Sequence, residues 1–217
     1  MMPMETANMK NRKETERRLI QAVGEIFRTE GYAGVRLNRI SRKATINKNL
    51  IYRYFGSPQQ LFKIYIEQQD FWSFYRDHID EILAANKQDK GRDLAKTVLE
   101  NQLDYFFDNE EMQQLIRWEI SEKNPISRGI SDMREHIGEQ MLQLTDEHFK
   151  NSYVNFRVLL ALMIAGVYYI VLHTKVNGST FCGIDINETD DMQKLHSTMR
   201  QMIDWAYENA AASKKSA

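Results

Sequence analysis

The chain has 217 residues, of which 42% are hydrophobic and 27% are charged, and its formal net charge is −1. These values are typical of an ordinary globular protein and exclude a disordered or low-complexity chain. The single cysteine, Cys182, excludes an internal disulfide and a cysteine-based metal cluster, and it fits a reducing cytoplasm.

Positive charge is concentrated in the first part of the chain. Residues 1–60 carry twelve Lys and Arg against five Asp and Glu, whereas residues 61–217 carry seventeen against twenty-five. The first segment therefore has a net charge of +7 and the second a net charge of −8. DNA would be attracted to the first segment and repelled by the second. A chance distribution over solvated helices is the alternative that charge alone leaves open.

The N-terminus is polar and charged and lacks the apolar segment of a secretion signal, so we expect a cytoplasmic protein. The longest apolar run extends from Val158 to Leu172, between Arg157 and His173. Because a bilayer span needs about 20 apolar residues, this run favours a buried helix over a membrane helix.

Hydrophobic spacing predicts three helices in the first 55 residues, over 13–30, 37–43 and 48–54. Leu19, Val23 and Phe27 recur at helical spacing in the first, and Gly31 ends it. Residues 45–47 form a tight turn between the second and third helices, and Gly56 ends the third.

Residues 57–60 predict the start of a long helix that continues past Phe71. Ser57 can cap it, Pro58 suits its first position, and Gln60 completes a capping box. Further helices are expected at 91–108, 111–122, 126–150, 153–175 and 188–209, with a loop at 176–187. No strand is expected. The sequence thus predicts an all-α fold with a DNA-binding domain at 1–56 and a helical domain at 57–217.

The second and third short helices have the form of a helix-turn-helix. The third begins with Asn47, Lys48 and Asn49. Leu50 and Ile51 would hold it to its domain. The polar side chains at its N-terminal end, with Arg53, would then be free to reach base edges and phosphates.

The stretch from Gly31 to Phe62 resembles the signature of the TetR family of transcriptional regulators, over roughly a quarter of the chain. The residues that carry the resemblance are Gly31-Tyr32, Leu37, Ile40-Ser41, Ala44-Thr45-Ile46-Asn47-Lys48, Ile51-Tyr52-Arg53-Tyr54-Phe55-Gly56-Ser57 and Leu61-Phe62. The ending Tyr-x-Tyr-Phe-Gly-Ser is the most specific part of the match.

The resemblance implies a homodimeric repressor that binds a palindromic operator and is released by a small, largely apolar effector. It implies DNA contacts by seven residues. Arg36 would meet a phosphate, Asn47, Lys48 and Asn49 would enter the major groove, Tyr52 and Tyr54 would donate to phosphates, and Arg53 would contact bases or phosphates. Packing against the first helix is the alternative for the two tyrosines, and a merely solvated charge is the alternative for Lys48 and Arg53.

Several residues depart from the family pattern. Thr45 and Asn49 replace glycines, so we expect the turn to bend without the left-handed freedom of glycine and the recognition helix to present a larger polar group. Amide side chains favour adenine, so the operator is expected to include A·T pairs. Pro58 replaces a phosphate-contacting Lys, and Arg36 leaves the second helix without a side-chain cap.

In the family the last two long helices pair with those of a partner, so a four-helix dimer interface is implied at 153–175 and 188–209. An internal core helix in a monomer is the alternative. The expected interface residues are Leu162, Ile164, Tyr169, Leu195, Met199, Met202 and Ile203.

Aromatic clusters in the second domain suit a pocket for an apolar effector, oriented by a few polar atoms. The expected lining residues are Trp72, Tyr75, Tyr105, Phe106, Trp118, Glu119, Tyr168 and His173. For each of them, filling a core is the alternative. The long helix after Ser57 is the expected lever between effector and DNA.

Other function classes find little support. The five histidines have no metal-ligand spacing, and the sequence has no phosphate-binding glycine loop and no G-x-S-x-G motif. We therefore expect no enzyme, no metal and no cofactor. A helical protein-binding adaptor without ligand control is the remaining alternative, and the basic N-terminal segment argues against it.

Overall fold

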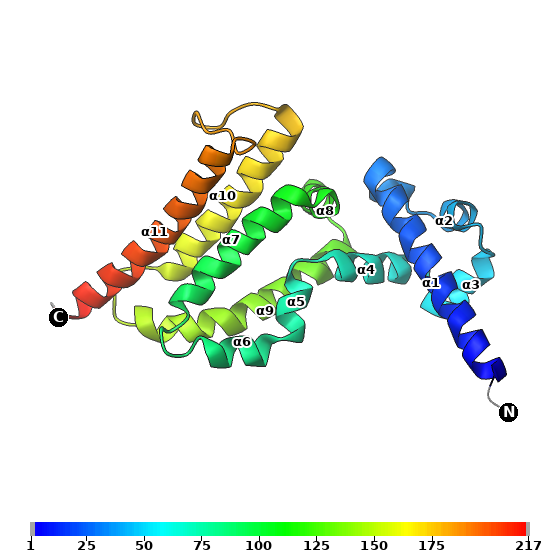
Figure 1. The fold of residues 1–217 in the computed structure, drawn as a ribbon, viewed down its shortest axis with the longest axis horizontal. Helices are drawn as coiled ribbons and strands as arrows, with labels where there is room; N and C mark the ends of the chain where they lie inside the picture. The colour runs from blue at the N-terminus through cyan, green and yellow to red at the C-terminus, as the bar shows by residue number, and fades with distance from the viewer. Residues whose placement is uncertain (1–2, 216–217) are drawn as a thin grey trace. The chain divides into compact units, whose positions relative to one another are not determined.

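The structure is a computed structural model that describes residues 3–215. All the named secondary-structure elements in this range are helices, joined by turns and loops (Figure 1). Among the described residues the one strand-like pairing is an isolated bridge between Phe181 and Ile184. The predicted all-α fold is therefore confirmed.

The helices follow the predicted order with a few differences. The N-terminal elements are α1 (Pro3–Glu30), the 3-10 helix η1 (Tyr32–Gly34), α2 (Leu37–Ala44), α3 (Lys48–Phe55) and α4 (Pro58–Gln69). The later elements are α5 (Trp72–Asp77), α6 (Ile79–Ala85), α7 (Arg92–Asp108), α8 (Glu110–Ser121), α9 (Pro125–Phe149), α10 (Phe156–Asn177) and α11 (Thr189–Lys215).

The prediction of one long helix from residue 57 past Phe71 is wrong. As predicted, Ser57 caps α4, because its hydroxyl oxygen accepts the Gln60 N–H at 3.0 Å. The helix nevertheless ends at Gln69, where Asp70 takes an extended conformation. The carboxylate of Asp70 accepts the Trp72 N–H at 2.9 Å, and this local bond competes with helix continuation. Because no glycine or proline marks the break, hydrophobic spacing gave no sign of it.

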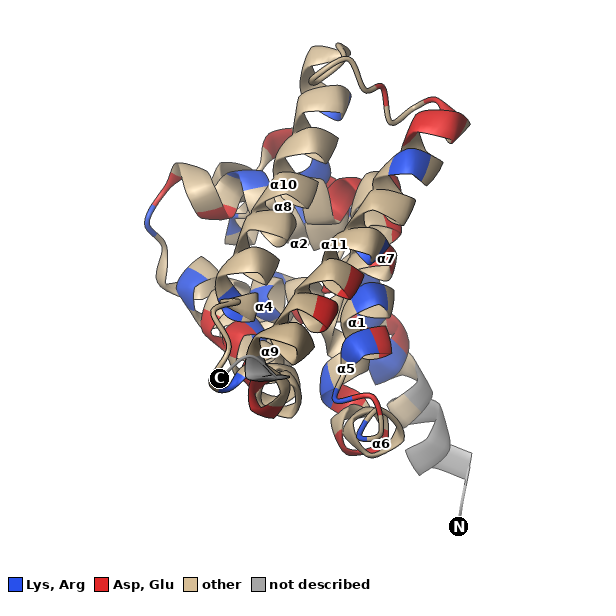
Figure 2. Ribbon diagram, turned by 90° about the vertical axis from the view of Figure 1, so that its left-hand side faces the viewer, with Lys and Arg blue, Asp and Glu red and all other residues tan. Residues whose placement is uncertain are grey.

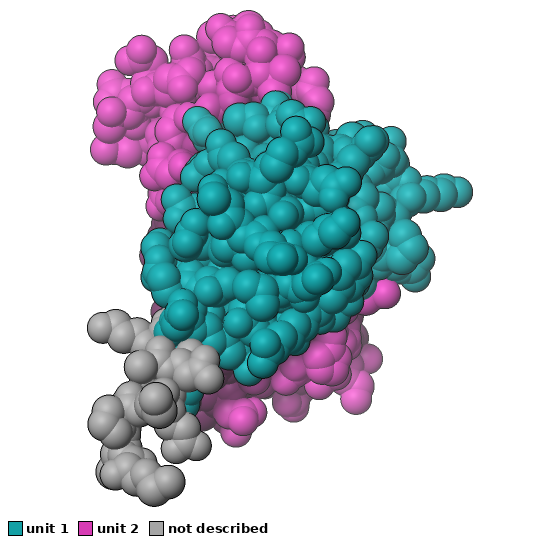
Figure 3. Space-filling view, turned by 90° about the vertical axis from the view of Figure 1, so that its right-hand side faces the viewer, with its two compact units in different colours: residues 1–73, 110–131 teal, residues 74–109, 132–217 magenta. Residues whose placement is uncertain are grey.

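The chain divides into two compact units (Figure 3). Unit 1 comprises the chain up to Ser73 together with residues 110–131, and unit 2 comprises residues 74–109 and the chain from Asp132 onward. Residue 56, the expected domain boundary, lies within unit 1. There α4 packs against α1 and α3, and α8 packs against α1 and α4.

An aromatic cluster joins α8 to the helix-turn-helix elements in the core of unit 1. The ring of Trp118 lies 4.6 Å from that of Tyr32 and 5.6 Å from that of Phe62, between ring centroids. At the edge of this contact, Arg28 and Glu111 form an ion pair of 2.7 Å. Trp118 was expected in an effector pocket. It lies in the core of unit 1 instead, because α8 packs against α1 and α4 and carries Trp118 against the rings of Phe27, Tyr32 and Phe62.

Truncating Trp118→Ala should destabilise the protein by about 3–5 kcal/mol, the range for deleting a buried aromatic side chain. Ile120→Ala is the matched control, because Ile120 lies on the same helix and is 75% exposed; we expect it to change stability by less than about 0.5 kcal/mol. Urea denaturation of both variants measures the difference. Equal effects would show that α8 is not a core element of unit 1.

In unit 2, helix α7 packs against both α10 and α11. The buried side chains include Leu99 and Phe106 of α7, Val171 of α10 and Ile203 of α11. Asp204 of α11 pairs with Arg92 and Lys96 of α7. Burial tends to raise the pKa of Asp204, but the hydrogen bonds from Lys96 and Arg92 outweigh it, so this pKa lies below its usual value.

Candidate nucleic-acid interface

Helix α3 is fixed at its start by a side-chain cap and along its inner face by apolar contacts. The side-chain oxygen of Asn47 accepts the Asn49 N–H at 2.9 Å. Ile51 and Phe55 are buried and hold α3 against unit 1. These contacts fix the orientation of α3 relative to the rest of unit 1, and therefore the direction of its outer face.

The polar side chains of α3 lie on this outer face. Lys48, Asn49, Tyr52 and Arg53 are exposed, and Tyr52 is 50% exposed in spite of its aromatic ring. Residues 48, 49, 52 and 53 follow helical spacing and share one face. Within the described part of the chain, neither Lys48 nor Arg53 forms an ion pair. Their charges are therefore available to an external acceptor.

The side chains of Asn47 and Asn49 differ in whether they are already hydrogen-bonded within the protein. The carbonyl oxygen of Asn47 is engaged in the helix cap, so Asn47 cannot offer both its oxygen and its amide group to one base without breaking the cap. Asn49 makes no such side-chain bond and is exposed. Asn49, rather than Asn47, therefore has the free amide that a bidentate contact to adenine needs.

The backbone of the turn between α2 and α3 is strained at Thr45, and two hydrogen bonds hold the turn in place. Thr45 takes the left-handed conformation itself, with φ 54° and ψ 45°, where we expected a turn without that conformation. For a side chain with a Cβ this costs about 1–2 kcal/mol. The hydroxyl of Ser41 donates to the Ile46 carbonyl at 2.6 Å, and Arg18 donates to the Ala44 carbonyl at 2.6 Å. These bonds stabilise the angle between the two helices.

Arg36 and Tyr54 are the two expected DNA-contacting residues that lie outside the outer face of α3. Arg36 precedes α2, is exposed and donates from Nε to the Ala33 carbonyl at 3.0 Å; as expected, α2 has no side-chain cap. Tyr54 is half-buried, and the Arg12 guanidinium carbon lies 5.2 Å from its ring centroid. Tyr54 thus packs against α1, which was the alternative to a phosphate contact, while its hydroxyl makes no hydrogen bond within the described residues.

The basic residues of α2 are largely neutralised inside unit 1. Lys43 pairs with Glu25 at 2.9 Å, and Arg39 pairs with Glu30. The hydrogen bond from Lys43 lowers the pKa of Glu25, and a bond from Gln21 adds to this effect. These residues border a hollow of about 560 Å³ between α1 and α2. Arg42 of α2 is exposed and forms no ion pair with the described residues, so the unpaired positive charge of the helix-turn-helix lies on both α2 and α3.

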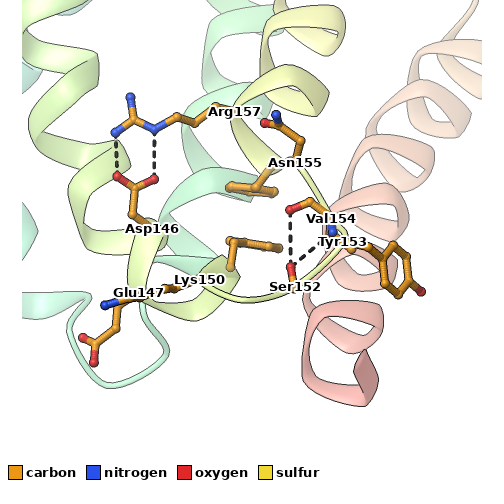
Figure 4. A pocket seen from close by; sticks show the side chains of 10 residues that line it. Asp146, Glu147, Lys150, Ser152, Tyr153, Val154, Asn155 and Arg157 are labelled. Atoms are coloured by element: carbon orange, nitrogen blue, oxygen red, sulfur yellow. Dashed lines mark hydrogen bonds and ion pairs between the residues drawn. The ribbon is translucent and has the colours of Figure 1, made fainter. Parts of the chain in front are cut away.

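The residues expected to line an effector pocket are divided between the two units. Trp72, Trp118 and Glu119 belong to unit 1, whereas Tyr75, Tyr105, Phe106, Tyr168 and His173 belong to unit 2. A hollow of about 710 Å³ lies where α9 meets α10 (Figure 4). All of its lining residues lie between Asp146 and Arg157, and none of them is a residue expected to line an effector pocket. Its Arg157 is already paired with Asp146 and Glu139.

In unit 2 the structure groups two of the expected residues with one that the sequence analysis did not select. The rings of Phe106 and Tyr168 lie 4.9 Å apart. Gln102, only 1% exposed, donates from Nε2 to the Tyr168 hydroxyl at 2.7 Å, and its Oε1 has no hydrogen-bond partner among the described residues. The sequence signal that could have identified Gln102 is its position, because this polar residue shares the helical spacing of the apolar residues Leu99, Leu103 and Phe106. Nearby on α7, Asn101 donates to the Tyr75 hydroxyl at 3.5 Å, and burial raises the pKa of Tyr75.

The two polar residues expected to orient an effector have other partners. Glu119 accepts a hydrogen bond from Ser131 within unit 1. His173, at the end of α10, contacts Ser179 at 2.9 Å and lies beside the ring of Phe181. These contacts fix the loop after α10, which is a structural role.

The expected dimer residues fall into two groups. Met199 and Ile203 are 4% and 0% exposed, so they are not on the surface of the protomer; they are buried because α11 turns this face toward α7. Ile164, Leu195 and Met202 are half-buried. Leu162 and Tyr169 are exposed at 68% and 54%.

Leu162 and Tyr169 belong to a longer apolar stripe that also includes Val158 and Val176, here called the α10 face. Figure 2 shows few charged residues along α10. By length and composition α10 could cross a membrane, yet only 28% of its apolar window is buried in the protomer. An exposed apolar stripe of this length indicates a surface that is covered in the working protein.

Comparison with known proteins agrees with this geometry. Residues 19–64 match the family model for the bacterial regulatory proteins of the tetR family. The HTH-type transcriptional repressor SCO4008 of Streptomyces coelicolor is 38% identical over 55 residues, which are 25% of this chain and 29% of that protein. The matched segment thus spans less than a third of this curated relative.

Two solved structures share the fold over most of their length. A Clostridium perfringens protein described as a fatty acid metabolism regulator has a TM-score of 0.62 at 16% identity, covering 86% of this chain and 96% of its own. A TetR-like transcriptional regulator from Rhodococcus sp. RHA1 has a TM-score of 0.55 at 15% identity, covering 91% and 96%.

Proposed function

We propose that the chain, whose residues 19–64 match the family model of the tetR regulators, is a homodimeric, cytoplasmic repressor of the TetR type whose two α3 helices read the halves of a palindromic operator. The observation that carries this proposal is the outer face of α3. Lys48 and Arg53 are exposed and unpaired there, beside the free amide of Asn49, on a helix held by Ile51 and Phe55. Short polar and basic side chains at this position are what major-groove recognition needs.

The α10 face supplies the second requirement, which is a partner subunit. A single helix-turn-helix reads one half-site weakly, and symmetry pairs two copies about one helical turn of DNA apart. A second copy of this chain is the proposed cover for Leu162 and Tyr169.

Selection of an operator from a random duplex pool, followed by a salt titration of the complex, tests DNA binding. A DNA-binding protein should lose affinity steeply as salt rises, because phosphate contacts release counterions. A helical protein-binding adaptor would select no sequence and show no such slope. Failure to enrich any sequence would therefore reject the proposed function in favour of the adaptor.

An effector is the third part of the proposal, and the group around Gln102 is the best-supported place for its polar end. Gln102 Oε1 is a buried acceptor without a partner, next to the rings of Phe106 and Tyr168. Buried acceptors are normally paired, so a ligand hydroxyl or amide that donates here would recover a lost hydrogen bond. An effector can release DNA only if it prefers the conformation that does not bind DNA.

A thermal-shift screen of apolar compounds that carry one donor group should find a stabilising ligand that also weakens operator binding. Acyl compounds belong in the screen because one protein of similar fold is a fatty acid metabolism regulator. At a ligand concentration of 100 Kd, the expected stabilisation is about 2.7 kcal/mol. Gln102→Leu should lose most of this shift, and Gln140→Leu, at a half-buried position on α9, is the control. Stabilising ligands that never alter DNA affinity would contradict the sensing model.

A further inference from the structure

The first turns of helix α1 precede the part of the helix that packs against the core of unit 1. Leu19 is the first buried residue of the chain's described side chains, whereas those that precede it from Met9 onward are exposed or half-exposed. Burial of apolar surface therefore does not hold these first turns, here called the α1 extension (residues 9–18). Helix-stabilising pairs support it instead, at Arg12–Glu16 (2.7 Å) and Glu14–Arg17 (2.6 Å).

One contact ties the α1 extension to the recognition helix. The Arg12 guanidinium lies over the ring of Tyr54, at 5.2 Å from the centroid, and Tyr54 follows Arg53 on α3. Figure 1 draws α3 beside the N-terminal part of α1. The contact places a cation of α1 next to the exposed outer face of α3.

The cations of the α1 extension are not equivalent. Arg17 is paired with Glu14, and Arg18 donates to the Ala44 carbonyl. Arg12 bonds Glu16 through Nε, which leaves its two terminal nitrogens without a hydrogen bond among the described residues. Lys13 is exposed and has no ion pair within the described part of the chain. Of the four cations of the α1 extension whose side chains the structure describes, Arg12 and Lys13 thus have donors to offer to an external anion.

We propose that the α1 extension is a second DNA-binding element, in which Arg12 and Lys13 bind backbone phosphates beside the groove that α3 enters. This proposal rests on the proposed function and names residues outside the helix-turn-helix itself. A planar guanidinium matches phosphate oxygens, and the ring of Tyr54 supports its orientation. Such contacts fix the position of a protein on the duplex without reading sequence.

Salt titration of DNA affinity with matched charge variants tests the proposal, with a mixed-sequence duplex and the selected operator as probes. Arg12→Met removes the charge but keeps an apolar stem to pack on Tyr54. Arg17→Met is the control, because it removes one charge from the same helix at a guanidinium whose three nitrogens already bond Glu14 and Gln21. For each lost phosphate contact, the slope of log affinity against log salt should shrink by about 1, and affinity at 0.1 M salt should fall about tenfold.

The expected result is a smaller slope for Arg12→Met and for Lys13→Met, a slope near that of the wild type for Arg12→Lys, and no change for Arg17→Met. All variants should melt at the same temperature as the wild type, since none of the described side chains before Leu19 is buried. Equal slopes for Arg12→Met and Arg17→Met, whether both reduced or both unchanged, would overturn the proposal, because general attraction would then explain the effect. Absence of salt-dependent binding by the wild type would instead reject the proposed function itself.

Discussion

The double variant Lys48→Ala/Arg53→Ala is expected to lose operator binding while the protein remains folded. Both side chains are exposed on α3 and unpaired within the described residues, so their removal leaves no buried group without a partner. Each contact to a base or phosphate contributes about 1–3 kcal/mol, and every substitution occurs twice in a symmetric dimer. The loss should therefore reach about 4 kcal/mol or more, which is roughly a thousandfold in Kd.

A gel shift with the selected operator measures this loss, and circular dichroism melting checks the fold. Lys194→Ala is the control, because Lys194 is an exposed cation of α11 that pairs with Asp191 at 2.7 Å and lies in unit 2. It changes the net charge without touching α3. An unchanged gel shift for the double variant would refute the assignment of α3 as the recognition helix.

The second large effect is expected from Leu162→Glu, which should convert the dimer into monomers and abolish operator binding. Leu162 is 68% exposed in the protomer, so a carboxylate there costs the isolated subunit little. In a dimer formed through the α10 face the same carboxylate would be buried without a partner, at a cost of several kcal/mol. Ile203→Glu cannot serve this test, because Ile203 is fully buried and its substitution would unfold the protomer.

Sedimentation velocity distinguishes the two states, and Ile120→Glu is the control at an exposed apolar position of unit 1. The wild type and Ile120→Glu should sediment as dimers and Leu162→Glu as a monomer. A Leu162→Glu variant that remains dimeric would place the interface elsewhere. A monomeric wild type that floats with lipid vesicles would make a bilayer, rather than a second copy, the cover of the α10 face.

Local sequence determined the elements that carry DNA recognition. The signals that mark these helices act within a few residues along the chain. They are the spacing of Leu19, Val23 and Phe27, the break at Gly31 and the Ser57 cap. The ends of α2 and α3, the end of α1 and the start of α4 were therefore predictable to within a residue. The exceptions are also local in origin. Helix α1 begins at Pro3 rather than at residue 13, and ion pairs rather than an apolar face support the α1 extension. Asp70 ends α4 through its own side chain, without a helix breaker.

Tertiary structure decided which surface each apolar side chain covers. The sequence analysis expected Trp118 in an effector pocket and Leu162 and Ile203 in a dimer interface. In the structure Trp118 lies in the core of unit 1, Ile203 is buried where α11 packs on α7, and Leu162 is exposed on α10. Helical spacing fixes the direction of a side chain relative to its own helix and carries no information about which distant helix arrives to meet it. The sequence by itself therefore determined the helix-turn-helix elements and which polar residues α3 carries. The packing of α7, α8 and α11 decided the rest, because contacts between segments far apart in the chain depend on the whole fold.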